Sequence, residues 1–174
     1  QNEIVVLTSS YGTVSAAHDN MKVLRTLTLL ANNEDIYKTI DISLAEKEKI
    51  NTHNNEILRQ TIEIENPDVI FVWNMYFFDK GILSVLENYS DKVVLFITDN
   101  WLITFVHPEY TNNYFDNIYT NLINNKDIQD KQFQKYNYNF EIIYSSKFVQ
   151  ALHHKNGIFA KREKVIYNGV EMSN

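Results

Sequence analysis

Lys92-Val93-Val94-Leu95-Phe96-Ile97-Thr98 is the most apolar run of the chain, and Asp99, Asn100 and Trp101 follow it directly. A short β-branched run of this kind, bounded by turn residues, is typical of a strand buried on both faces of a parallel sheet. Polar residues directly after such a strand lie at its carboxyl end, where open parallel sheets bind their ligands. This stretch therefore predicts both the architecture and the place of the functional residues.

Apolar runs on either side repeat this pattern and alternate with helical periodicity. We predict further strands at Glu3–Thr8, Ile36–Ile42, Asp68–Trp73, Glu141–Tyr144 and Lys164–Tyr167. We predict helices over Ala17–Asn32, Ser43 to about Glu65, Ile82–Tyr89, Phe115–Leu122 and Ser146–Asn156. The second begins with a capping box at Ser43, and the last ends at Gly157 as a left-handed cap. The helix that begins at Phe115 is expected to continue through Phe133 and Tyr136. Residues 99–109 show no clear period. The alternation predicts an α/β fold, namely a Rossmann-like three-layer α/β/α arrangement with a mainly parallel sheet of about six strands.

The composition limits the classes of function. The chain has 174 residues, of which 44% are hydrophobic and 22% charged, as expected of one folded domain. Its net charge of −6 argues against nonspecific binding of nucleic acid, and the absence of cysteine excludes disulfides and thiolate nucleophiles. No apolar run approaches the roughly 18 residues that a membrane span needs. We expect a cytoplasmic protein without a transmembrane segment, with peripheral attachment at the inner membrane face left open. The start at Gln1 lacks both a signal peptide and an initiating Met, so we expect residues to have been removed upstream.

The loop after the first predicted strand contains Tyr11, Gly12 and Thr13 and leads into a predicted helix. Free amides and the helix dipole at such a position favour an anion. The loop has one glycine instead of the three of a dinucleotide-binding fingerprint, and it lacks the lysine of a phosphate-binding P-loop. An ordinary turn with Ser and Thr caps is the competing interpretation, and both stay open.

Two other strand ends supply the main candidates. Asp99 can accept a hydrogen bond from a sugar hydroxyl or act as a general base, and the indole of Trp101 can stack on a sugar ring. The competing interpretations are an Asx-type turn for Asp99 and a lid over the sheet edge for Trp101. Thr98 precedes them, and Asn74 and Tyr76 offer an amide and a phenol after the preceding strand.

The last two predicted strands end near Ser145 and Asn168, which we expect to bind substrate at the same edge of the sheet. The five histidines have no partner at the spacing of metal ligands. His153 and His154 are adjacent and do not share a helix face. We therefore predict no metal site.

Three stretches together resemble a known family. They are Pro67–Asn74, Val93–Leu102, and the segment from Ile142–Phe148 through Lys164–Val170. In the last of them, a strand ending in Ser leads into a helix, and a later strand ending in Asn-Gly-Val closes the domain. This pattern resembles the N-terminal domain of the retaining glycosyltransferases of family 4. The resemblance implies one half of a GT-B fold, with residues 1–170 as the acceptor-side domain, residues 171–174 as the start of a linker, and a C-terminal donor-binding domain outside the chain.

The resemblance also implies a function for the whole protein. It implies transfer of a sugar, with retention, from a nucleotide-sugar donor to a glycan or lipid-linked acceptor, with no metal and no further cofactor. By this match, Tyr11 to Thr13 approach the donor phosphates, and Asp99 and Trp101 fall in the family's His-Asp-x-Trp-like segment, with Thr98 in place of the His. The chain alone is expected to be inactive. The alternatives are a non-catalytic binding module and half of a GT-B-like nucleotide-sugar epimerase.

Overall fold

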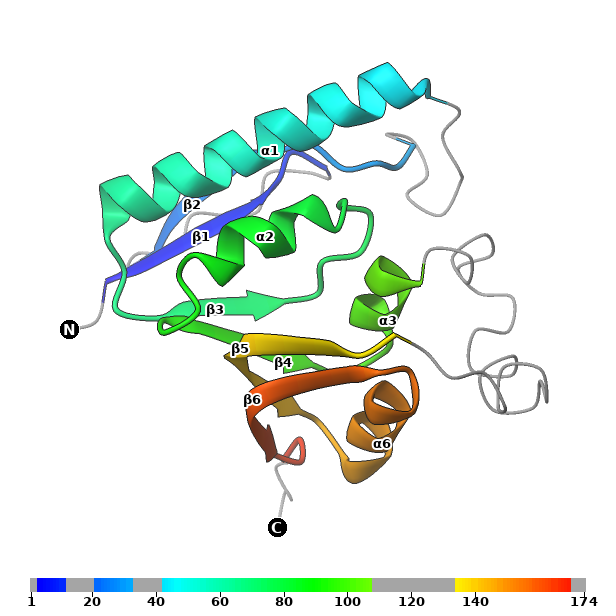
Figure 1. Cartoon of the computed structure of the whole chain (residues 1–174). Coiled ribbons are helices and arrows are strands. Elements are labelled where there is room, and N and C mark those ends of the chain that lie inside the picture. The colour runs from blue at the N-terminus through cyan, green and yellow to red at the C-terminus, as the bar shows by residue number, and fades with distance from the viewer. Residues whose placement is uncertain (1–2, 12–20, 33–41, 108–133, 170–174) are drawn as a thin grey trace, which may run out of the picture. The chain divides into compact units, whose positions relative to one another are not determined.

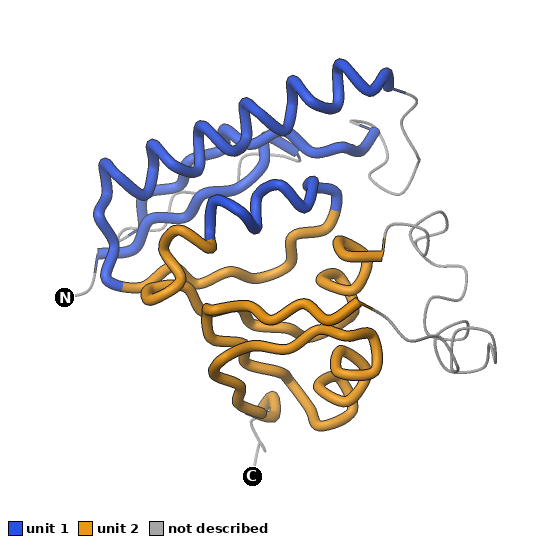
Figure 2. Tube along the Cα trace, viewed as in Figure 1, with its two compact units in different colours: residues 1–68, 77–86 blue, residues 69–76, 87–174 orange. Residues whose placement is uncertain are grey.

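The computed structural model describes residues 3–11, 21–32, 42–107 and 134–169. The chain divides into two compact units, shown in Figure 2. Unit 1 comprises residues 1–68 and 77–86, and unit 2 comprises residues 69–76 and 87–174. Each unit contains its own parallel sheet, which confirms the predicted α/β class.

Unit 1 contains a two-stranded parallel sheet and a long helix (Figure 1). Its elements are β1 (Ile4–Ser9), β2 (Met21–Leu27), α1 (Leu44–Glu65) and most of α2 (Gly81–Glu87). The predicted capping box opens α1, because the Ser43 hydroxyl accepts from the Glu46 amide at 3.3 Å and the Glu46 carboxylate accepts from the Ser43 amide at 3.0 Å. Asn54, buried in α1, bonds both the amide and the carbonyl of Thr28 at 2.9 and 2.7 Å. These bonds tie α1 to the segment that follows β2.

Unit 2 contains the four-stranded sheet that carries most of the candidate residues. Its strands are β3 (Ile70–Trp73), β4 (Val93–Ile97), β5 (Tyr136–Tyr144) and β6 (Ile158–Val165), all parallel and in the order β3-β4-β5-β6. The helices α3 (Trp101–Val106) and α6 (Lys147–Lys155) follow β4 and β5. One face of the sheet is buried, with Leu95, Ile97, Ile142 and Tyr144 at 0% exposure.

Both helices of unit 2 lie on this buried face. The Tyr144 ring packs against His153 of α6 with ring centroids 5.3 Å apart. The imidazole of His107, which caps α3, lies 3.0 Å from the carbonyl oxygen of Asn156, which caps α6. The strands β3 to β6 stand in the sheet in the same order as in the chain. Right-handed crossovers between such strands place all connecting helices on one face, as observed for α3 and α6.

The structure corrects the predicted sheet and one predicted helix. Instead of one sheet of about six strands, the described residues form parallel sheets of four and two strands, an arrangement compatible with a Rossmann-like fold. The helix predicted over Ala17–Asn32 is wrong, because Met21–Leu27 forms β2. The pairing of β2 with β1 runs from Ile4↔Met21 to Ser9↔Leu27 and outweighs the helical spacing of the apolar side chains. Val23 and Thr26, both β-branched, also favour a strand.

Smaller differences occur in unit 2. Helix α3 lies within residues 99–109, where the sequence shows no helical periodicity. All six of its residues are buried, and a helix without a polar face shows no alternation of polar and apolar residues. Strand β5 already begins at Tyr136, where a helix was predicted to continue, and β6 begins directly after Gly157, which has the predicted left-handed conformation at φ 79°. The helix predicted at Phe115–Leu122 and most of the strand at Ile36–Ile42 lie outside the described residues.

Candidate functional site

The carboxyl ends of β3, β4 and β5 bring several of the predicted residues together within unit 2. The phenol of Tyr76, after β3, donates a hydrogen bond to the side-chain oxygen of Asn100, after β4. The backbone amide of Ser145, after β5, donates to the carbonyl of Ile97 at the end of β4, at 2.9 Å. Hydrogen bonds therefore join all three strand ends, and the loop after β4 lies in the middle.

Asp99 occupies that central loop and is half-buried. One carboxylate oxygen accepts from the backbone amide of Trp101 at 3.0 Å, and the other lies 3.4 Å from the Thr98 hydroxyl. The first bond is the Asx-type turn that was the structural alternative for this residue. Each carboxylate oxygen has a second lone pair, so the turn leaves acceptor capacity for a ligand hydroxyl.

The loop after β3 holds its shape through a strained residue. Asn74 adopts φ 54°, in the left-handed region, and its side-chain oxygen accepts from the backbone amide of Tyr76 at 3.2 Å. Asn tolerates this conformation better than most residues because its short polar side chain bonds the local backbone. The turn exposes the Asn74 side chain and directs Tyr76 toward Asn100.

Asn100 belongs to this cluster but was not selected from the sequence. It is 3% exposed and stands at the N-cap of α3 without making a side-chain cap bond. Its amide oxygen is instead occupied by the Tyr76 phenol. Its position between Asp99 and Trp101, after the most apolar strand, was the only sequence signal for this role.

Trp101 lies in the core. Its side chain is 0% exposed and packs edge-to-face on Phe105 of the same helix, with ring centroids 5.4 Å apart. Its indole nitrogen is buried without a hydrogen-bond partner in the described part of the chain. This burial leaves no ring face open for stacking on a sugar. In this structure Trp101 is therefore a core residue that packs against Phe105.

The other predicted binding residues are more scattered. Tyr11 is half-buried and belongs to unit 1, and Gly12 and Thr13 lie outside the described residues. Asn168 is exposed in the segment after β6. That segment begins beside the end of β5, because the Ile166 amide donates to the Tyr144 carbonyl at 2.9 Å.

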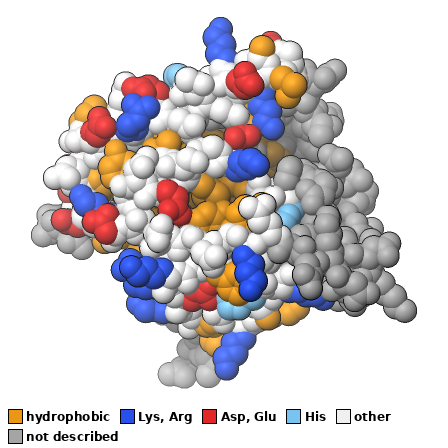
Figure 3. Space-filling view, viewed as in Figure 1, with side chains coloured by type: hydrophobic (Ala, Val, Ile, Leu, Met, Phe, Trp, Pro, Cys, Tyr) orange, Lys and Arg blue, Asp and Glu red, His pale blue; other side chains and the backbone are white. Residues whose placement is uncertain are grey.

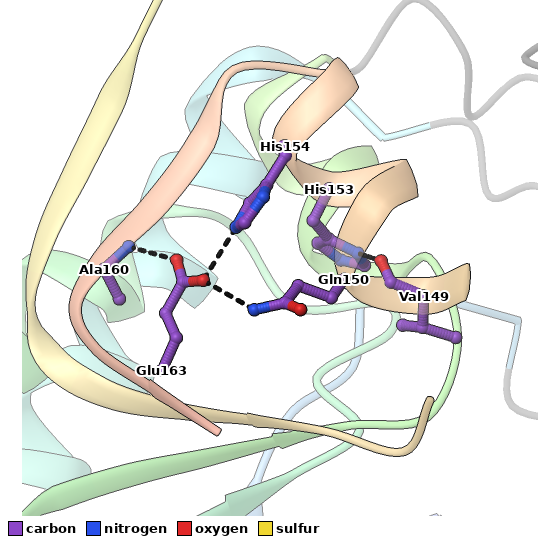
Figure 4. Close-up of polar contacts among 6 residues, drawn as sticks. All are labelled: Val149, Gln150, His153, His154, Ala160 and Glu163. Carbon is purple, nitrogen blue, oxygen red and sulfur yellow. Dashed lines mark hydrogen bonds and ion pairs between the residues drawn. The ribbon is translucent and has the colours of Figure 1, made fainter. Parts of the chain in front are cut away.

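A second polar cluster joins α6 to β6 and is centred on Glu163 (Figure 4). One carboxylate oxygen accepts from the backbone amide of Ala160 at 2.8 Å. The other accepts from the Gln150 amide at 3.0 Å and lies 2.7 Å from the His154 imidazole nitrogen. The carboxylate is 14% exposed, and protein groups occupy both of its oxygens, so we assign it to structure.

Two buried titratable groups lie next to this cluster. Burial lowers the pKa of His153 to about 4, and the hydrogen bond from its Nδ1 to the Val149 carbonyl at 2.8 Å only partly opposes that shift. Its Nε2 is buried without a partner among the described residues. Burial also raises the pKa of Tyr144 above its ordinary value, and the charge of Glu163 adds to the effect. Both side chains are therefore neutral at pH 7, and neither is placed to take a proton from a substrate.

Replacing Glu163 by Gln tests the structural assignment of this cluster. Gln keeps one oxygen for the Ala160 amide but places an NH₂ group against Gln150 and His154. We expect a loss of about 1–2 kcal/mol in the free energy of unfolding, measured by urea denaturation, because hydrogen bonds to a charged acceptor are lost. The matched change Glu48→Gln, at an exposed position of α1, should stay within about 0.5 kcal/mol of the parent. Equal effects of the two changes would contradict the assignment.

Comparison with known proteins adds no assignment, because no protein-family model, no curated protein and no solved structure matches the chain. None of the helices in the described ranges is long and apolar enough to cross a lipid bilayer. Within those same ranges, no three His, Asp or Glu side chains lie together as a metal site would require. Figure 3 shows acidic and basic side chains interspersed over the face it draws.

Proposed function

We propose that the chain is the acceptor-side half of a glycosyltransferase, which moves a sugar from a nucleotide-sugar donor to a glycan or lipid-linked acceptor with retention. The observation that carries the proposal is the cluster at the carboxyl ends of β3, β4 and β5, where the Tyr76 phenol donates to Asn100, the sequence neighbour of Asp99. Open parallel sheets bind ligands at this edge. The sequence resemblance supplies the reaction class, and a C-terminal domain supplies donor binding.

Within this proposal, Asp99 is the acceptor for a substrate hydroxyl. Its bond to the Trp101 amide fixes the carboxylate at the start of α3, and a charge-assisted hydrogen bond to a hydroxyl contributes about 1.5–3 kcal/mol. Tyr76, held by Asn100, and the exposed Asn74 amide supply further polar groups at the same edge of the sheet.

A second candidate function is a transferase-like binding module without catalysis. The burial of Trp101 favours it, because the aromatic platform expected from the sequence is not exposed. Thr98, which stands in place of the family's His, also favours the binding module. The two candidates differ in whether Asp99 affects turnover or only affinity.

The test is Asp99→Asn in the full-length protein, with transfer measured from a panel of nucleotide sugars. We expect transfer to fall by at least about tenfold, which corresponds to about 1.4 kcal/mol, while the melting temperature changes little because Asn also accepts from the Trp101 amide. The matched control is Asp91→Asn, an exposed turn residue before β4 at the opposite end of the strand. Unchanged turnover per folded molecule in Asp99→Asn would exclude the catalytic role.

A further inference from the structure

The sheet of unit 2 has a second face, opposite the one on which its own helices α3 and α6 lie. Phe71 and Trp73 of β3 point to this face and are 60% and 63% exposed, whereas Val72 between them is 7% exposed on the other face. Val94 and Phe96 of β4 share the open face through their pairing with Phe71 and Trp73, and both are half-buried. Phe71 and Phe96 stack with ring centroids 6.0 Å apart. The β3–β4 side of the face is therefore an exposed apolar surface.

The β5–β6 side of the same face is charged. Glu141 of β5 is 15% exposed and lies between two cations of β6, Lys164 at 2.8 Å and Arg162 at 3.6 Å. The cations themselves are 63% and 50% exposed. Two cations against one carboxylate leave a net positive edge beside the apolar surface.

The topology explains why this face is open. Because β3 to β6 follow one another in one direction, right-handed crossovers place α3 and α6 together on the opposite face. All-parallel sheets occur almost only with helices on both faces, so the expected cover for the open face is a helix.

The dimensions and the charge specify that helix further. Strands lie about 4.8 Å apart, so β4 and β6 are separated by roughly 10 Å, close to the width of about 10–12 Å of a helix with its side chains. One helix resting over β4 and β5 therefore reaches the apolar surface on one side and the cationic edge on the other.

We propose that the open face binds an amphipathic α-helix of a partner polypeptide. Its apolar stripe covers Phe71, Trp73 and Phe96, and acidic side chains on one flank face Arg162 and Lys164. The proposal does not depend on sugar transfer, since it uses the opposite side of the sheet from α3 and α6 and none of the strand-end residues.

The two tryptophans make the proposal directly measurable. Trp73 is exposed and Trp101 is fully buried, so a ligand on the open face shifts and protects only the Trp73 emission. The probe is a synthetic 18-residue helical peptide with a leucine stripe and glutamates on one flank, titrated into the whole chain. A second peptide carries lysines in place of the glutamates. We expect a blue shift, reduced acrylamide quenching, and at least tenfold tighter binding of the glutamate peptide at low salt.

Three variants locate the binding. Phe71→Ser should weaken binding at least tenfold, and Lys164→Glu should remove the preference for the glutamate peptide. Ile64→Ser, at an apolar residue of α1 that is 77% exposed, should leave the affinity unchanged. Binding that is absent, is equal for both peptides, or is insensitive to Phe71→Ser would overturn the proposal. Self-association of the chain that Phe71→Ser abolishes would also overturn it, in favour of a second copy as the occupant.

Discussion

Between pH 6.5 and pH 4, the free energy of unfolding is expected to fall by about 3 kcal/mol through the titration of His153 alone. The imidazole is fully buried, and burial lowers its pKa from 6.5 to about 4 in the folded state. Across this pH window the unfolded chain binds a proton that the folded chain does not bind. Acid therefore favours unfolding, and the lost stability is regained as the pH is raised from 4 to 6.5.

His153→Leu should flatten this pH dependence. Leucine has no proton to gain and fills a similar volume, and it also removes the buried Nε2 that has no partner among the described residues. Urea denaturation at several pH values between 4 and 7 measures the slope. The control is His53→Leu at an exposed position of α1, which should keep the slope of the parent protein. The same slope in His153→Leu and the parent would show that another group controls the acid response.

The parts of the fold that the sequence predicted are those with a local cause. The capping box at Ser43 and Glu46 fixes the start of α1, and Gly157 permits the left-handed turn after α6. The apolar run before Thr98 forms β4 with Val93, Leu95 and Ile97 fully buried. Each of these signals lies within a few residues, so no distant partner is needed to interpret it.

The parts that the sequence did not predict depend on distant partners. Met21–Leu27 is a strand because β1 pairs with it, and nothing in its own spacing records that pairing. Helix α3 is buried all round by neighbours that the periodicity of residues 101–106 does not reveal.

The same distinction applies to the candidate site. The strand-end rule brought Asn74, Tyr76, Thr98 and Asp99 to one edge, because the rule follows from the direction of parallel strands. It could not say which side chains face solvent there. Trp101 points into the core, and Asn100, which was passed over, holds the Tyr76 phenol.

Replacing Trp101 by Ala is expected to lower the free energy of unfolding by about 3–5 kcal/mol, because a large buried ring leaves a cavity that its neighbours fill only in part. A loss of that size is a large share of the roughly 5–15 kcal/mol that stabilises an ordinary domain. Trp101→Phe should cost clearly less, since it keeps an aromatic ring against Phe105 and removes an indole N–H that is buried without a partner in the described part of the chain.

The second tryptophan provides the matched control for this prediction. Trp73→Ala removes an equally large side chain that is 63% exposed, and a surface change of this kind stays within about 0.5 kcal/mol. Urea denaturation of the three variants and the parent separates a packing role from a ligand role. If Trp101 stacked on a sugar from an open position, Trp101→Ala would weaken ligand binding and leave stability close to that of Trp73→Ala. If Trp101→Ala loses stability and Trp73→Ala does not, the Trp101 indole is a core residue. The ligand contacts at this edge of the sheet would then come from Asp99, Asn74 and Tyr76.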